Sequence, residues 1–406
     1  MQSDETQVIR DLAKRYMEVA ASEENAKKRN LWKGINQLTP ERPAVLVEEL
    51  PWHEMGDADA LTPVSADADI RKLELFLRRG LFRAEHIHDD YVFLPYYRCV
   101  KTVEHAGFGI AVQEETLDQG DDNNIVSHHY NSQINSEEDL EKIKMPQAKY
   151  NEAATMKTFE KLSEVLGDAM PVRVTGDNLA FQIWDWLARI MSPDQILLDM
   201  AMRPELMHGL IARAAEAYRQ RLRQYNEQRL IDKDFDRVHC SFIFNDELNG
   251  AEDISQNTWT YGTAQLFGSV SPAMHKEFEF DYVKDLYAEF GLTMYGCCEP
   301  LHDRMELLFD AIPNLRKISL SPWCDIEIAS MKMGKNYVGS VKPNPASVEC
   351  VSVDWDEVRR DLTLKRDVCA GNGTPAEFIL KDISTVHRDP ARLTKWANLA
   401  SELVRA

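Results

Sequence analysis

The 406-residue chain lacks the features of exported and membrane proteins. Residues 1–5 hold no basic stretch ahead of an apolar one, so we expect no signal peptide. The longest run without charge, residues 254–275, is rich in Ser, Thr, Asn and Gln, which excludes a membrane-spanning helix there. Seven cysteines, an odd number without an export signal, indicate reduced thiols. The sequence therefore predicts a cytoplasmic protein.

Positive charge is also scarce. The chain has 47 Lys and Arg against 67 Asp and Glu, a formal net charge of −20. Because a surface of this sign repels phosphate groups, we expect neither nucleic acid nor an anionic membrane as a partner. No Gly-x-Gly-x-x-Gly follows a predicted strand and no Gly-Lys-Ser/Thr loop occurs, so nucleotide binding is not indicated either.

Strand-like and helical patterns alternate from about residue 150 onward. Apolar runs rich in β-branched residues are separated by helical stretches, and with one early run they lie at 42–47, 171–175, 237–245, 292–297, 317–320, 337–342 and 377–380. Such alternation predicts right-handed βαβ units and a parallel sheet. Seven strands are one short of eight, and the best match is an α/β protein with a distorted (β/α)₈ TIM-type barrel. An open doubly wound sheet is the alternative.

The chain is expected to hold one elaborated barrel. We predict an N-terminal helical extension over residues 1–40 and the barrel over residues 41–406. An irregular β-rich insertion is expected at about 86–135, with residues 107–112 as its clearest strand.

Reactive groups of such barrels collect at the carboxyl ends of the strands. Thiols, carboxylates and histidines gathered on one rim are also what a metal ion needs. The candidates at the predicted strand ends are Glu49, Trp52, His53, Asp177, Asp246, Glu247, Cys298, His302, Lys342, Lys381 and Asp382.

The sharpest local feature is the pair Cys297-Cys298, followed by Glu299 and His302. Thiolates are soft ligands for Zn²⁺, but cysteines also serve as small buried apolar residues. Because adjacent side chains on a strand point to opposite faces, only one of the pair should face inward, and we favour Cys298. His302 is either a ligand or a packing residue of the following helix.

Two other segments allow different interpretations. His239-Cys240 looks like a ligand pair, but it opens its predicted strand, so we expect it at the bottom of the barrel in a packing role. The uncharged run 254–275, with Trp259 among its aromatic residues, is either a lid over the barrel mouth or an ordinary long loop.

The order and spacing of several segments over about residues 40–404 resemble the uroporphyrinogen decarboxylase superfamily. These segments are Val172-Arg173-Val174-Thr175-Gly176-Asp177, Trp184-Asp185-Trp186, Met202-Arg203-Pro204-Glu205-Leu206, Val270-Ser271-Pro272 with Phe278, the run from Val338 to Pro345, and the run from Thr385 to Pro390. The resemblance implies a distorted (β/α)₈ barrel. It also implies either the decarboxylases of haem synthesis or cobalamin-linked methyltransferases, in which a His-x-Cys pair and a later Cys hold zinc.

Departures from the family pattern favour the methyltransferase branch. The decarboxylases carry an Arg-rich segment after the first strand, whereas here no Arg or Lys occurs between Arg42 and Arg71. A substrate with many carboxylates would meet like charge without compensation. In the methyltransferase pattern Cys298 matches the thiol of the His-x-Cys pair, whose His is missing, and Asp382 stands near the place of the later Cys.

The leading hypothesis is a methyltransferase component that moves a methyl group from a small methylated substrate, such as a methyl ether, to a corrinoid carried by a partner protein. Zinc would polarise the leaving heteroatom, and the resemblance also allows a homodimer. The expected metal ligands are Cys298, Glu247, Asp382 and His302; the expected catalytic residues are Asp177, Glu247, His53 and Asp246; the expected substrate-binding residues are Glu49, Trp52, Lys342, Lys381 and Trp259. A decarboxylase and a non-catalytic barrel that binds a corrinoid or metabolite are the alternatives.

Overall fold

A seven-stranded parallel sheet forms the centre of the protein. The computed structural model describes residues 3–56, 58–117 and 126–406. The sheet order is β1-β15-β14-β13-β12-β11-β8, and every pairing in it is parallel. Its strands are β1 (Ala44–Val47), β8 (Ala180–Phe181), β11 (Trp259–Gly262), β12 (Leu292–Tyr295), β13 (Leu315–Leu320), β14 (Val338–Val341) and β15 (Ala376–Leu380).

The composition of these strands explains their position. Strands β1, β12, β14 and β15 are buried at every residue. Continuous apolar or β-branched runs are typical of parallel strands, because both faces of such strands are buried, one under the helices and the other in the interior of the protein. The structure therefore confirms the parallel sheet that the alternation predicts.

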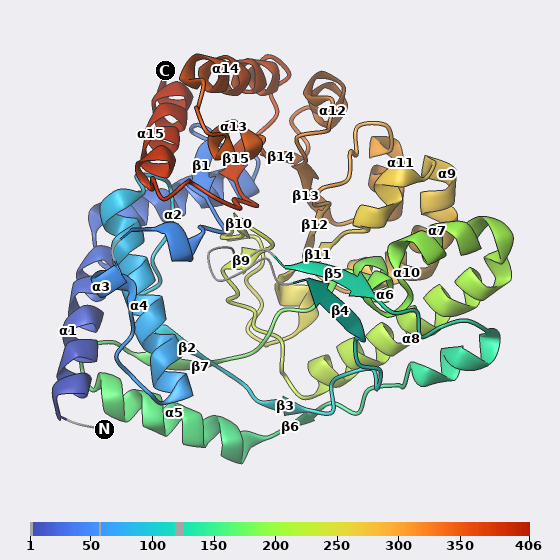
Figure 1. Cartoon of the computed structure of the whole chain (residues 1–406), viewed down its shortest axis with the longest axis horizontal. Coiled ribbons are helices and arrows are strands. Elements are labelled where there is room, and N and C mark those ends of the chain that lie inside the picture. The colour runs from blue at the N-terminus through green and yellow to red at the C-terminus, as the bar shows by residue number, and fades with distance from the viewer. Residues whose placement is uncertain (1–2, 57, 118–125) are drawn as a thin grey trace.

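Helices form an outer ring around the strands (Figure 1). They are α1 (Ser3–Ala20), α2 (Glu23–Asn36), α3 (Ala58–Leu61), α4 (Ala68–His86), α5 (Glu152–Leu166), α6 (Ile183–Met191), α7 (Pro193–Met202), α8 (Pro204–Glu227), α9 (Pro272–His275), α10 (Asp281–Ala288), α11 (Met305–Ala311), α12 (Ile326–Met333), α13 (Ala346–Glu349), α14 (Trp355–Gly371) and α15 (Ala391–Arg405). A π-helical turn, Lys276–Phe280, joins α9 to α10. Ser271 caps α9, with its side chain accepting a hydrogen bond from the Met274 amide and Pro272 at the first helical position.

The remaining strands form two-stranded pairs. A parallel pair joins β2 (Tyr97–Val100) to β7 (Val172–Thr175). Antiparallel pairs join β3 (Val103–Glu104) to β6 (Lys149–Tyr150), β4 (Glu114–Leu117) to β5 (Ser127–Tyr130) and β9 (Arg237–Val238) to β10 (Ser241–Phe242). Among the described residues no strand pairing links β8 back to β1. The architecture is thus compatible with a TIM-like fold, with closure of the barrel left as a prediction.

Four sequence expectations are wrong in detail. Residues 171–175 contain β7, which pairs with β2 and lies outside the seven-stranded sheet. Residues 237–245 are not one strand, because His239 adopts φ +51° and the chain reverses there into the β9–β10 hairpin. Residues 254–275 are not a lid, because β11 in that run is an inner strand of the sheet. Residues 107–112 form no strand.

Helix α2 closes the amino end of the sheet. Trp32 of α2 is fully buried, and its indole donates to the Asp90 carbonyl oxygen. The Asn36 side chain donates to the carbonyl oxygens of Phe242 and Phe244. These contacts tie α2 to the chain that leaves the β9–β10 hairpin, and buried apolar residues of α2 pack against β1 and β10.

A buried ion pair lies inside the sheet. Lys317 of β13 and Glu377 of β15 are both fully buried, with 2.6 Å between Lys317 Nζ and Glu377 Oε2. The Lys317 ammonium also donates to Ser241 Oγ at 2.6 Å. The positive charge of Lys317 is thus balanced inside the protein by the negative charge of Glu377.

No helix in the described part of the chain is long and apolar enough to span a membrane.

Candidate functional site

Side chains from three strands meet at the carboxyl end of the sheet. Cys298 follows β12, Lys381 and Asp382 follow β15, and Glu49 follows β1. Cys298 Sγ lies 4.0 Å from Asp382 Oδ2, and Lys381 Nζ lies 2.6 Å from the same oxygen. The Asp382 amide donates to Glu49 Oε2 at 2.8 Å. We call these four residues, together with Cys297, His239 and Cys240, the strand-end cluster.

The backbone of this cluster adopts uncommon conformations. Glu49 and Asp382 have φ of +55° and +57°, in the left-handed region that non-glycine residues rarely adopt. Gly296, with φ +98°, precedes the two cysteines, and a Cβ on it would lie 2.4 Å from the Leu301 side chain. Strained positions of this kind gather at functional sites.

His239 and Cys240 belong to the cluster, and their expected place at the barrel bottom is wrong. His239 Nε2 lies 3.2 Å from Cys297 Sγ, and Cys240 Sγ lies 3.7 Å from Glu49 Oε1. The turn at His239 carries both side chains to the strand ends. The adjacent His and Cys in the sequence indicate a candidate functional pair. The expectation of one continuous strand over residues 237–245 assigns this pair to the amino end of the sheet, which is the wrong end.

The two adjacent cysteines differ in acidity. The hydrogen bond between the two sulfur atoms, 3.5 Å apart, lowers the pKa of the Cys298 thiol, and the Lys381 ammonium lowers it further. Burial and the carboxylates of Asp382 and Glu299 act in the opposite direction. The same hydrogen bond and burial raise the pKa of Cys297. Since Cys297 stays protonated at neutral pH, the Asp382 carboxylate is the charge that keeps Lys381 protonated despite burial. Cys298, half-buried, is therefore the more reactive thiol of the pair.

Asp246 and Glu247 lie at the opposite end of the sheet. Glu247 forms a two-pronged ion pair with Arg316 at the start of β13, with distances of 2.6 and 2.8 Å. Asp246 pairs with Lys33 of α2 at 2.5 Å. The prediction puts both carboxylates at the carboxyl end of a strand because it takes residues 237–245 as one continuous strand. The structure does not bring them to Cys298.

Three other predicted residues have partners outside the cluster. The Lys342 ammonium is buried at the end of β14, where its partner is Ser340 Oγ, and burial lowers its pKa. His302 accepts a hydrogen bond at Nδ1 from the Asp325 amide at 3.2 Å. His53 is exposed, with Nε2 3.7 Å from Glu54 Oε1.

Asp177, Trp52 and Trp259 have separate surroundings. Asp177 is exposed and lines a cavity of about 440 Å³ with Tyr91 and Arg237. Trp259 opens β11 and is fully buried, so it is a core residue and not part of a rim. Trp52 lines a second cavity, described below.

The residues of the cluster do not fit a zinc ion as they are placed. Of the four predicted ligands only Cys298 and Asp382 are neighbours. Across residues 3–56, 58–117 and 126–406 no three His, Cys, Asp or Glu side chains converge as metal ligands. The Lys381 ammonium, 2.6 Å from Asp382 and 3.6 Å from Cys297 Sγ, adds positive charge where a cation would need negative charge. Zinc stays a prediction of the sequence.

A cavity of about 500 Å³ adjoins the cluster through Glu48 and Glu49. Its basic side chains come from α4 and from the residue that opens β9, and they are Lys72, Arg79, Arg83 and Arg237. Glu48 pairs with Arg237 at 2.5 Å. Glu48 is thus compensated by an arginine distant in sequence, and for this residue the expectation of uncompensated negative charge is wrong.

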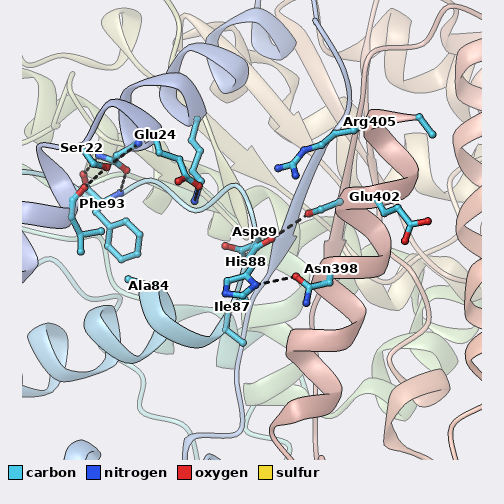
Figure 2. A pocket seen from close by; sticks show the side chains of 15 residues that line it. Ser22, Glu24, Ala84, Ile87, His88, Asp89, Phe93, Asn398, Glu402 and Arg405 are labelled. Atoms are coloured by element: carbon cyan, nitrogen blue, oxygen red, sulfur yellow. Dashed lines mark hydrogen bonds and ion pairs between the residues drawn. The ribbon is translucent and has the colours of Figure 1, made fainter.

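Another cavity, of about 840 Å³, lies elsewhere. Figure 2 shows it between the ends of α2 and α4 and helix α15, where the His88 ring contacts the Asn398 side chain at 3.0 Å. None of its lining residues belongs to the strand-end cluster.

Comparison with known proteins supports the architecture. The structure is similar to that of a methyltransferase from Methanosarcina mazei, with a TM-score of 0.50 over 92% of this chain and 97% of that chain. The chain shares the fold of that methyltransferase. The two sequences are 10% identical, so the likeness concerns the fold alone. No protein-family model matches the chain, and no curated protein matches it.

Proposed function

We propose that this protein is a methyltransferase that moves a methyl group from a small methylated substrate to a corrinoid carried by a partner protein. The observation that carries the proposal is the strand-end cluster, a thiol of lowered pKa beside an ammonium group, at the end of the sheet where enzymes of this architecture place their chemistry. The methyltransferase with the same fold supports the reaction class.

The cluster offers two groups that methyl transfer can use. The Cys298 thiolate is an electron-rich sulfur and is the proposed nucleophile toward the methyl carbon: as the S–C bond forms, the bond from the carbon to the donor heteroatom breaks. The Co(I) corrinoid of the partner protein would then take the methyl group from the Cys298 sulfur, which restores the thiolate. Lys381, fixed by Asp382, would stabilise the negative charge that develops on the heteroatom as the methyl group leaves. Cys297, whose sulfur lies 3.5 Å from that of Cys298, would assist by donating its S–H to the thiolate.

The remaining cluster residues would position these groups. The Glu49 carboxylate accepts a hydrogen bond from the Asp382 amide, and this contact fixes the backbone next to Lys381. Burial lowers the pKa of His239, so the ring is neutral at neutral pH and can accept or donate a hydrogen bond at Cys297. A corrinoid on a partner protein would approach at the strand ends, since α2 covers the opposite end.

The test is a spectral titration of the purified protein with a Co(I) corrinoid protein and a panel of methyl ethers, methylamines and methyl thioethers. Formation of methyl-Co(III) that depends on both the enzyme and the donor is the expected result. Absence of methyl-Co(III) with every donor class would contradict the proposal.

A decarboxylase is the second candidate, because the cavity beside Glu49 carries four basic side chains that could bind an acidic substrate. Release of CO₂ from uroporphyrinogen or a smaller acid, without any corrinoid protein, would favour this candidate over methyl transfer.

A further inference from the structure

Arg79 differs from the other arginines around the cavity beside Glu49. Arg83 pairs with Asp89 at 2.6 Å, and Arg237 pairs with Glu48. Even Arg78, the neighbour of Arg79 in α4, pairs with Glu74 at 2.8 Å. Within the described residues, by contrast, Arg79 has no carboxylate partner, although it is half-buried and lines the cavity.

The surroundings of Arg79 are aromatic. Its guanidinium lies 5.0 Å from the centre of the Trp52 ring. Phe76 and Tyr91 line the same cavity. Burial lowers the pKa of Arg79, and no charged neighbour offsets this effect, which agrees with the absence of a partner. A guanidinium that is partly withdrawn from water and unpaired is prepared for an anionic ligand.

The cavity leads from Arg79 to the strand-end cluster. Glu49 lines it, and the same carboxylate bonds to the Asp382 amide and contacts Cys240 Sγ. The volume of about 500 Å³ is in the range of small-molecule sites. A ligand held at Arg79 would therefore extend toward Glu49, the residue of the strand-end cluster that lines this cavity.

We infer that this cavity binds a small aromatic carboxylate, with Arg79 holding the carboxylate, Trp52 and its aromatic neighbours packing on the ring, and the methyl-bearing group directed toward Glu49. The inference deepens the proposed methyl transfer, on which the methylated nature of the ligand rests.

The test is isothermal titration calorimetry without any corrinoid protein, with 4-methoxybenzoate, benzoate and neutral methoxybenzene as probes. We expect the two carboxylates to bind at least about tenfold more tightly than methoxybenzene. Arg79→Gln should weaken carboxylate binding by about 10- to 100-fold and leave the neutral probe unchanged, since a charge-assisted hydrogen bond is lost. Arg79→Lys should retain part of the preference.

Arg71→Gln is the matched control, because Arg71 is an exposed arginine of the same helix that does not line the cavity. Circular dichroism of each variant separates a loss of binding from a loss of folding. Equal affinity of wild type for charged and neutral probes, no saturable binding of either carboxylate, or an unchanged affinity in Arg79→Gln would each overturn the inference.

The binding and transfer experiments fail independently. Carboxylate binding at Arg79 without methyl-Co(III) formation would leave the cavity assignment intact and remove the proposed function. Methyl transfer from donors that bind equally well to wild type and Arg79→Gln would support the proposed function and remove the cavity assignment.

Discussion

The two ends of the parallel sheet carry the same kinds of charged side chains in different arrangements. At the amino end, Glu247 pairs with Arg316 and Asp246 with Lys33, and α2 covers the interior. At the carboxyl end, Lys381 and Asp382 adjoin two thiols and an open cavity that contains an arginine without a partner. Charged pairs at one end join elements of the fold, whereas those at the other end adjust the acidity of Cys298.

A substitution in the interior, between the two ends of the sheet, should have the largest effect on the free energy of unfolding. Glu377→Gln would leave the fully buried Lys317 without its counter-charge. We expect a loss of about 3–5 kcal/mol in the free energy of unfolding, measured by urea denaturation. A loss below about 1 kcal/mol would show that Ser241 and the surrounding carbonyl groups suffice to hold the ammonium.

At the carboxyl end, Lys381→Met should change acidity more than stability. The ammonium lowers the pKa of the Cys298 thiol, so its removal should move the midpoint of Cys298 alkylation to higher pH. Below that midpoint less thiolate is present, and alkylation at pH 7 should slow severalfold. The measurement is iodoacetamide labelling against pH, read at the Cys298 peptide by mass spectrometry.

The labelling experiment has an internal control in the exposed Cys350, which lies outside the cluster. Its profile should not change with the substitution. If the Cys298 and Cys350 profiles coincide in wild type, the proposed activation of Cys298 is wrong.

At the amino end, Glu247→Gln should have the smallest effect. The side chain of Glu247 is 40% exposed in its pair with Arg316. Partly exposed pairs contribute about 0–1 kcal/mol, so the variant should unfold within that range of wild type and transfer methyl groups at an unchanged rate. A large loss of transfer would restore the catalytic role that the sequence predicted for Glu247.

The sequence predicts five of the seven strands of the sheet, because the signal of those five is local. Apolar runs such as Val338–Val341 are buried on both faces wherever they pair, and their order along the chain determines the order in the sheet. The sequence does not predict a strand at Trp259–Gly262, because polar residues alternate there as they do in loops. In the structure Thr260 is buried, and its hydroxyl donates a hydrogen bond to the Leu179 carbonyl oxygen.

The site is predictable only in part, since contacts between distant segments build it. Cys298, Asp382 and Glu49 follow strands that the sequence identifies, and they do meet. His239 reaches them through a reversal at a single left-handed residue, which no hydrophobic pattern reveals. Arg79 faces the same region from a helix, although it is 30 residues from Glu49 in the chain.

The most direct test of the account is the single-turnover rate of methyl-Co(III) formation in Cys298→Ser, with Cys350→Ser as the matched control. We expect a rate at least about 100-fold lower for Cys298→Ser and a wild-type rate for Cys350→Ser, with both variants folded. A wild-type rate in folded Cys298→Ser would contradict the assignment of methyl transfer to the strand-end cluster.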